Sequence, residues 1–257
     1  VFVGSLMLGN LRGVRESGRI FALPTYFFIG SILALIAVGV WRLVSGTVQP
    51  VVAAAPLEPT GQMLGLFLLL TAFSNGCTAM TGVEAVSNGV PAFEPPEAAN
   101  AAATMLMMAV LSITMFLGIT ALAQAYAIVP SDTETVVSQL ARGVFAGRGV
   151  AYYLIQVATM LILVLAANTA YADFPRLASI LARDRFMPRQ FMNQGDRLAF
   201  SNGIVGLSIF AALLLVVFGG DTHALIPLYM IGVFVSFTLS QAGMVVRPRP
   251  LRAPGRK

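Results

Sequence analysis

The chain has 257 residues, of which 57% are hydrophobic and 11% charged, and its formal net charge is +5 at pH 7. Soluble domains carry about 25% charged residues, so this composition argues against a soluble enzyme. The pI near 9.9 does not indicate a nucleic-acid partner, because the basic residues are thinly spread and the sequence carries no motif that reads DNA or RNA. A single cysteine, Cys77, allows no internal disulfide and no cysteine-based metal cluster.

Between its charged residues the chain has six uncharged runs of 22 to 34 residues each. A helix needs roughly 20 apolar residues to cross the hydrocarbon layer of a bilayer. The runs lack the alternation of barrel strands, and no polar face recurs along them as it would in a soluble helical core. They predict six transmembrane helices, within residues 20–41, 59–83, 98–131, 149–172, 198–220 and 222–246.

The two ends of the chain are predicted to lie outside these helices. Residues 1–10 are apolar but too short to span, so we expect them to be the stub of a seventh helix. Because the sequence begins with Val1, we also expect a missing N-terminal segment. Residues 1–247 are predicted to form a single, partial transmembrane domain, and the basic, proline-rich tail 248–257 to be disordered.

The distribution of Lys and Arg predicts the orientation, since these residues accumulate on the cytoplasmic side of a membrane. With six helices, thirteen of the sixteen lie on the side that holds loops 10–19 and 174–197 and the C-terminus. The other side keeps only Arg42, Arg142 and Arg148. We therefore predict a multi-pass protein of the cell membrane, with those two loops and the C-terminus in the cytoplasm.

Residues 131–145 predict a short helix on the external surface. Ser131 and Glu134 have the spacing of a capping box, which starts a helix. The plain interpretation is a structural lid packed over the bundle, and the alternative is a direct role in ligand binding. Apolar residues recur on roughly one face, at Val136, Val137, Leu140, Val144 and Phe145.

The run that begins at residue 59 changes character after Phe73. Small and polar residues weaken a helix in mid-membrane, and the freed backbone groups survive there only if they face protein, water or a bound ion. Interrupted helices of this kind form binding sites in secondary transporters. The alternative is a kinked helix whose small residues allow close packing. The residues concerned are Ser74, Asn75, Gly76, Thr78, Thr81, Gly82, Glu84, Ser87, Asn88 and Gly89.

Other polar residues also lie within the predicted helices. Glu84 is costly near the membrane interior unless it is paired, protonated or hydrated, which leaves it as a proton acceptor or as a cap on backbone amides. Asn168 and Tyr171 follow a wholly apolar stretch. Tyr229 lies two residues after Pro227, where it either gates a pore or anchors the helix at the interface.

Several stretches resemble the amino acid–polyamine–cation superfamily of secondary transporters. Two further stretches, 82–93 and 226–241, are most similar to its KimA-type potassium importers, which are thought to couple potassium uptake to protons. The stretches that carry the general resemblance are 10–18 (NLRGVRESG), 81–85 (TGVEA), 166–176 (AANTAYADFPR) and 182–188 (ARDRFMP).

This resemblance implies a LeuT-like fold of two inverted five-helix repeats around a midplane site. Residues 64–247 would supply the second repeat, so the chain would hold helices five to ten and a stub of the fourth. The broken first helix of the family, and its third helix, would be absent. The family pattern implies Thr81 or Thr78 as an ion ligand in the broken sixth helix, with Gly82 and Glu84 beside it, and Tyr229 as a gate.

The leading hypothesis is a secondary transporter that imports potassium, with a proton as the second transported species and no cofactor. An amino acid permease and an inactive membrane fragment are the alternatives. No Ser/His/Asp arrangement, His or Cys cluster or nucleotide-binding loop suggests an enzyme. The expected partners are the lipid bilayer and a small solute, either a potassium ion or an amino acid, with a homodimer as one assembly.

Overall fold

The chain folds into helices, and the computed structural model contains no β-strand among the residues that it describes, which are 2–11, 18–48, 65–77, 82, 86, 89–90, 93–131, 133–193 and 200–246. In chain order the helices are α1 (Phe2–Leu11), α2 (Gly18–Val44), α3 (Leu66–Gly76), α5 (Glu97–Ala125), α6 (Val136–Val144), α7 (Val150–Arg183), the short 3-10 helix η3 (Arg189–Met192), α8 (Ser201–Val217) and α9 (Thr222–Val246).

Four of these helices, α2, α5, α7 and α9, are long and apolar enough to cross a membrane. Each of the four overlaps one of the uncharged runs. Most of their large apolar side chains are at least partly exposed, as expected of helices that face lipid. The prediction of an all-α polytopic membrane protein is confirmed.

The remaining apolar runs give shorter helices. α8 has 17 residues and α3 has 11, while α1, with 10 residues, covers the predicted stub. The run 59–83 is not one continuous helix, because α3 ends at Gly76. A length of 11 residues corresponds to about 16 Å of helix, which is half of the hydrocarbon thickness.

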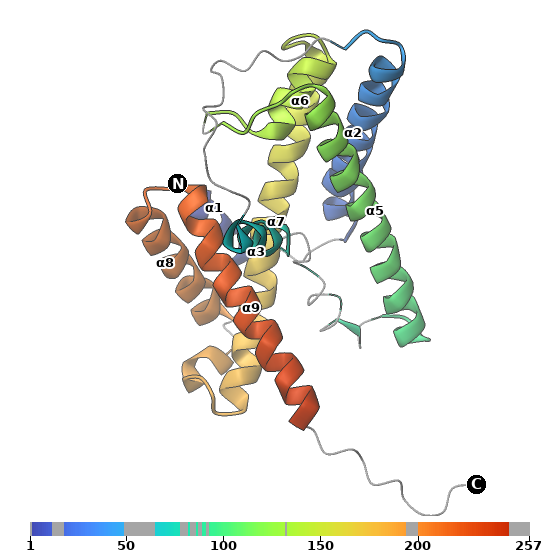
Figure 1. The fold of residues 1–257 in the computed structure, drawn as a ribbon. Coiled ribbons are helices and arrows are strands. Elements are labelled where there is room, and N and C mark those ends of the chain that lie inside the picture. Colours follow the sequence, from blue (N-terminus) through green and yellow to red (C-terminus); the bar gives the residue numbers. More distant parts are fainter. Residues whose placement is uncertain are drawn as a thin grey trace, which may run out of the picture. The chain divides into compact units, whose positions relative to one another are not determined.

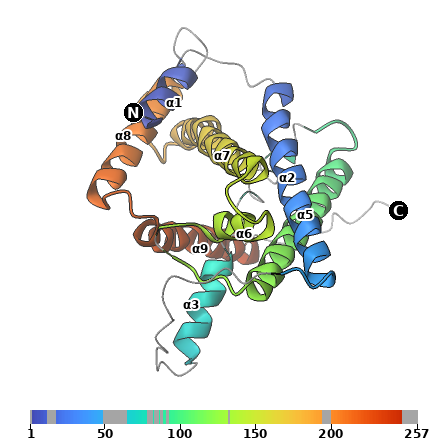
Figure 2. The same cartoon turned by 90° about the horizontal axis from the view of Figure 1, so that it is seen from above.

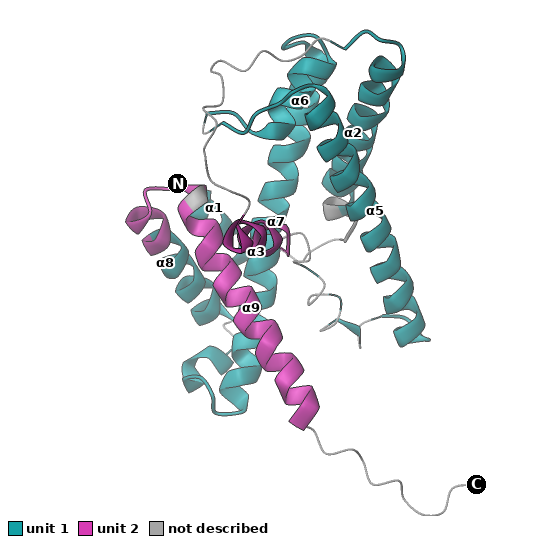
Figure 3. Cartoon of the chain, in the orientation of Figure 1, with its two compact units in different colours: residues 1–60, 82–212 teal, residues 61–81, 213–257 magenta. Residues whose placement is uncertain are grey.

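The chain groups into two compact units (Figure 3). The first consists of residues 1–60 and 82–212, and the second of residues 61–81 and 213–257. Within the second unit, α3 packs on α9. The prediction of a single transmembrane domain over 1–247 stays a prediction, and the tail 248–257 lies outside the described residues.

The core of the first unit lies where α2, α5 and α7 come together near α6 (Figures 1 and 2). α5 buries only Ala101 and Leu122 of its 29 residues, so most of its surface is left for lipid. The buried residues of this core cluster come from α2, α5, α6 and α7, and one of them, Tyr126, directly follows α5. They are Ile32, Leu35, Leu122, Tyr126, Leu140, Ala141, Val144, Tyr152 and Ile155.

α6 is the predicted short amphipathic helix, but it begins differently from the prediction. The helix starts at Val136, and its N-cap is Thr135, whose Oγ1 accepts a hydrogen bond from the backbone N–H of Ser138 at 3.3 Å. The predicted capping box of Ser131 and Glu134 is wrong. Its glutamate side chain instead contacts Ser138 and Arg142, and Ser131 Oγ accepts from the N–H of Thr133 in the preceding turn.

Two glycines allow α2 and α5 to approach closely. A Cβ added at Gly39 would lie 2.6 Å from Leu122 Cδ1, and one added at Gly118 would lie 2.7 Å from Ile36 Cδ1. In lipid, helices gain little from hydrophobic burial against each other, so close backbone approach through small residues supplies much of their packing energy. The two glycines therefore set the spacing of this helix pair.

We predict that Gly39→Val destabilises the protein, because the new side chain overlaps Leu122 and overpacking costs about 1–3 kcal/mol. The matched control is Gly30→Val in the same helix, where no described atom lies within 4 Å of an added Cβ. Thermal unfolding in detergent, followed by size-exclusion chromatography, measures both variants. Equal unfolding temperatures for the two variants would show that Gly39 has no packing role.

Candidate functional site

The interruption predicted after Phe73 begins where α3 ends. The backbone N–H of Cys77 closes the helix onto the carbonyl of Phe73, with Ser74 and Asn75 in its last turn. Gly82 then has a φ of +99°, which lies outside the right-handed helical region and which residues with a side chain rarely adopt. A regular helix therefore does not continue through Gly82.

Of the five predicted site residues, Gly82 and Tyr229 are among those that the structure describes. Thr78, Thr81 and Glu84 lie outside the described residues. Gly82 belongs to the first unit, and Tyr229, which is 41% exposed, belongs to the second. Binding roles for these five residues stay predictions.

Tyr229 lies in α9 two residues after a proline inside the helix, Pro227. A proline in a helix interior has no N–H, so one carbonyl of the preceding turn loses its helical partner. This places a weakened turn next to the tyrosine. The geometry agrees with either role that the sequence allowed, a gate or an interfacial anchor.

Asn168, one of the polar residues predicted at depth, joins α7 to α1. Asn10 Nδ2 donates to Asn168 Oδ1 at 2.8 Å and to the carbonyl oxygen of Leu6 at 2.9 Å. Such polar contacts between helices in lipid contribute about 0.6 kcal/mol on average. Asn10, which the sequence placed at the start of a loop, is part of the last turn of α1. Asn168 thus has a partner that the sequence analysis missed.

Tyr171, one turn further along α7, contacts α8. Its hydroxyl lies 2.9 Å from Ser208 Oγ, which also donates to the carbonyl oxygen of Ile204 at 2.9 Å. Both side chains are buried. Since the single proton of Ser208 goes to the carbonyl, Tyr171 is the donor of the pair. The two helices also meet at Gly203, where an added Cβ would lie 2.9 Å from the backbone of Pro175.

Asn168 and Tyr171 therefore act in contacts between helices. Thr169, which lies between the two, donates to the carbonyl of Leu165 in its own helix at 3.0 Å. In the part of the chain that the structure describes, no three His, Cys, Asp or Glu side chains gather into a group that could hold a metal ion. The segment around Gly82 remains the best candidate for a solute site.

Comparison with known proteins agrees with this architecture of apolar helices. Residues 1–249, nearly the whole chain, match the family described as amino acid permease. The chain belongs to this family, which is part of the amino acid–polyamine–cation superfamily of membrane transporters and not a family of enzymes.

Among its relatives is the potassium transporter KimA of Bacillus subtilis (strain 168). The two are 52% identical over 242 residues, which cover 94% of this chain and 40% of the relative. The chain thus spans about 40% of the length of the curated relative that it matches.

We predict that Gly82→Ala destabilises the protein by roughly 1–2 kcal/mol, because a Cβ disfavours positive φ. No described atom lies within 4 Å of the added Cβ, so the cost comes from the backbone conformation. Gly76→Ala is the matched control, because Gly76 is helical with similar space around it and alanine favours a helix. Thermal unfolding that is unchanged in Gly82→Ala would contradict this conformation.

Proposed function

We propose that the protein that contains this chain, at its full natural length, is a secondary active transporter that imports potassium together with protons. The observation that carries the proposal is that α3 ends at Gly76 and that Gly82 has a positive φ, in a chain that is 52% identical to a potassium transporter. An interrupted helix leaves backbone dipoles available to a solute at membrane depth.

Potassium recognition requires several oxygen ligands, because the ion loses its hydration shell in a narrow site. The proposed ligands are the hydroxyl groups of Thr78 and Thr81 with backbone carbonyls of residues 76–82. Carbonyls freed at the end of α3 carry the partial negative charge of a helix C-terminus, which favours a cation. A cation therefore suits the end of α3 better than an anion does.

A second candidate substrate is an amino acid, which the description of the matching family favours. In that case backbone amides at the start of a following half-helix, next to the glycines, would hold the carboxylate. The two candidates thus use opposite ends of interrupted helices, and a single uptake assay in transport-deficient cells separates them.

The experiment expresses the full-length protein in cells that lack potassium uptake and measures growth at low potassium, with rubidium-86 uptake as the direct readout. Growth rescue and saturable rubidium uptake support potassium transport. Accumulation of a labelled amino acid with no potassium effect would overturn this proposal in favour of the permease. Full-length protein that reaches the membrane but moves neither solute would overturn both candidates. The inactive-fragment hypothesis is tested by expressing the 257-residue chain by itself, which should then reach the membrane and move neither solute.

The proposed orientation follows the distribution of basic residues, with loops 10–19 and 174–197 and the C-terminus in the cytoplasm of a cell-membrane protein. Potassium would then enter from the α6 side. Glu84 is proposed as the proton acceptor, because a carboxylate next to an ion site changes its charge when it binds a proton.

We predict that Thr81→Ala raises the half-saturating potassium concentration roughly tenfold, as expected for the loss of about 1.4 kcal/mol of binding. Thr71→Ala is the matched control, because Thr71 is exposed in α3 and its hydroxyl donates only within the helix, to the carbonyl of Phe67 at 2.9 Å. Rubidium uptake measures both variants at equal membrane expression. If Thr81→Ala transports with wild-type affinity, Thr81 is not a ligand.

We predict that Glu84→Gln removes the stimulation of potassium uptake by an inward proton gradient, because the amide cannot take up the proton. Uptake into vesicles with and without the gradient measures the effect. Glu94→Gln serves as control, since Glu94 is an exposed carboxylate outside the predicted site. Full stimulation in Glu84→Gln would instead assign Glu84 to capping of backbone amides.

A further inference from the structure

α6 is buried more deeply than a helix that merely covers a surface. Leu140, Ala141 and Val144 are all 0% exposed. They belong to the core cluster together with residues of α2, α5 and α7. A helix that only rests on a membrane surface would turn such side chains toward lipid. The apolar face of α6 instead forms part of the core of the first unit.

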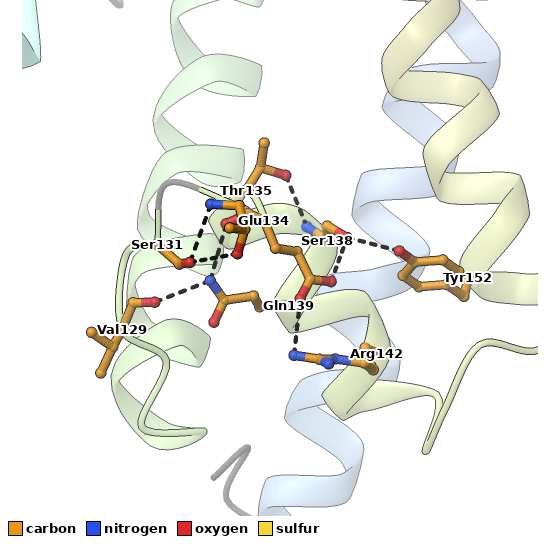
Figure 4. Close-up of polar contacts among 9 residues, drawn as sticks. Val129, Ser131, Glu134, Thr135, Ser138, Gln139, Arg142 and Tyr152 are labelled. Atoms are coloured by element: carbon orange, nitrogen blue, oxygen red, sulfur yellow. Dashed lines mark hydrogen bonds and ion pairs between the residues drawn. The ribbon is translucent and has the colours of Figure 1, made fainter. Parts of the chain in front are cut away.

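A cluster of four polar side chains holds α6 in place, and we call it the Glu134 latch (Figure 4). Glu134 Oε2 lies 2.9 Å from Arg142 Nη2, and Glu134 Oε1 accepts from Ser138 Oγ at 2.8 Å. Ser138 Oγ lies 2.9 Å from the hydroxyl of Tyr152 in α7. Because Ser138 gives its proton to Glu134, Tyr152 is the donor to Ser138. The latch thus connects the start of α6 directly to α7.

A second polar contact ties α6 to the end of α5. Gln139 Nε2 donates to the carbonyl oxygen of Val129, just beyond α5, at 3.0 Å, and to that of Glu134 at 3.1 Å (Figure 4). The Gln139 side chain is buried, so breaking these bonds without replacement would leave a buried amide unsatisfied. α6 is therefore fixed to both helices that it connects.

Among the described residues, the core cluster beneath the latch includes no Asp, Glu, Lys or Arg. Burial raises the pKa of the Tyr126 phenol above its ordinary value of 10.0, and the positive charge of Arg42 partly opposes this shift. Tyr126 is fully buried and therefore stays neutral at physiological pH. Neutral, close-packed surroundings favour a permanent contact over one that opens to water.

α2 and α5 contact each other close to the core residues of α6. The buried residue of α5 near this end is Leu122, and Gly118 lies against Ile36 of α2 one turn earlier. α2 contributes Ile32 and Leu35 to the same core. The ends of three long helices therefore meet in one packed cluster with α6 at its centre.

From this geometry we infer that α6 is a fixed anchor of α2, α5 and α7, held by the Glu134 latch, and not a lid that opens during each transport cycle. The transport part of this inference rests on the proposed function. Movement in the first unit would then spare this end, and α6 would keep its contacts with α7 in every state.

Cysteine accessibility separates an anchor from a lid. Ala141→Cys, at a position that is 0% exposed, is made in a Cys77→Ala background of the full-length protein and treated with a water-soluble maleimide at rest and during rubidium uptake. An anchor predicts that Ala141→Cys stays unlabelled in both conditions, while Ser131→Cys, at an exposed position, is labelled in both. Labelling of Ala141→Cys during uptake would overturn the inference. Val144→Cys, also at a position that is 0% exposed, is a second variant if the first fails to fold.

Hydrogen exchange tests the anchor without any transport assay. The amides of α6 are expected to exchange as slowly as those of α7 in the wild-type protein. Glu134→Gln should raise their exchange about tenfold, since it weakens the latch, while Glu94→Gln should leave it unchanged. Fast exchange of α6 in the wild type, or no effect of Glu134→Gln, would overturn the anchor. If the protein transported neither potassium nor an amino acid, the proposed function would be wrong. The anchor would still be tested, because hydrogen exchange does not depend on transport.

Discussion

The constraint on which this structure depends is that lipid offers no hydrogen bonds to a polypeptide backbone. α2, α5, α7 and α9 meet it with helices of 25 to 34 residues that close most of their own hydrogen bonds, although α2, α7 and α9 each contain a proline. α3 does not, since it stops at Gly76 inside an uncharged run and Gly82 follows with a non-helical φ. A chain can leave backbone groups open there only if protein, water or a solute takes them up. Because of this requirement, the end of α3 and the positive φ of Gly82 indicate a candidate site.

The same solvent also decides how the helices of the first unit hold together. Since lipid is as apolar as the helices, their association depends on close packing and on polar pairs. Both close packing and polar pairs occur in the first unit. Glycines bring α2 to α5, an amide pair joins α1 to α7, and a hydroxyl pair joins α7 to α8. Asn168 and Tyr171 of α7 are therefore best understood as structural.

The sequence predicted the features that depend on composition along the chain, and missed those that depend on distant partners. Length and hydropathy located the four long helices, and the cluster of glycine and hydroxyl residues located the end of α3. Asn10 and Asn168 are 158 positions apart, and no local pattern states that they pair. The capping box failed for a related reason. The spacing of Ser131 and Glu134 allowed a cap. In the structure the Glu134 carboxylate instead contacts Arg142 and Ser138, and Thr135 caps the helix.

The two compact units differ in how much they bury, and this difference bears on where conformational change is least costly. None of the eleven residues of α3 is buried, and Met230 is the buried hydrophobic residue of α9. The α6 end of the first unit, in contrast, contains six large side chains with less than 2% exposure. Opening free energy rises with the packed area that must separate. α3, the helix that stops at Gly76, belongs to the loosely packed unit, so we expect its contacts to separate at a lower cost than those at the α6 end.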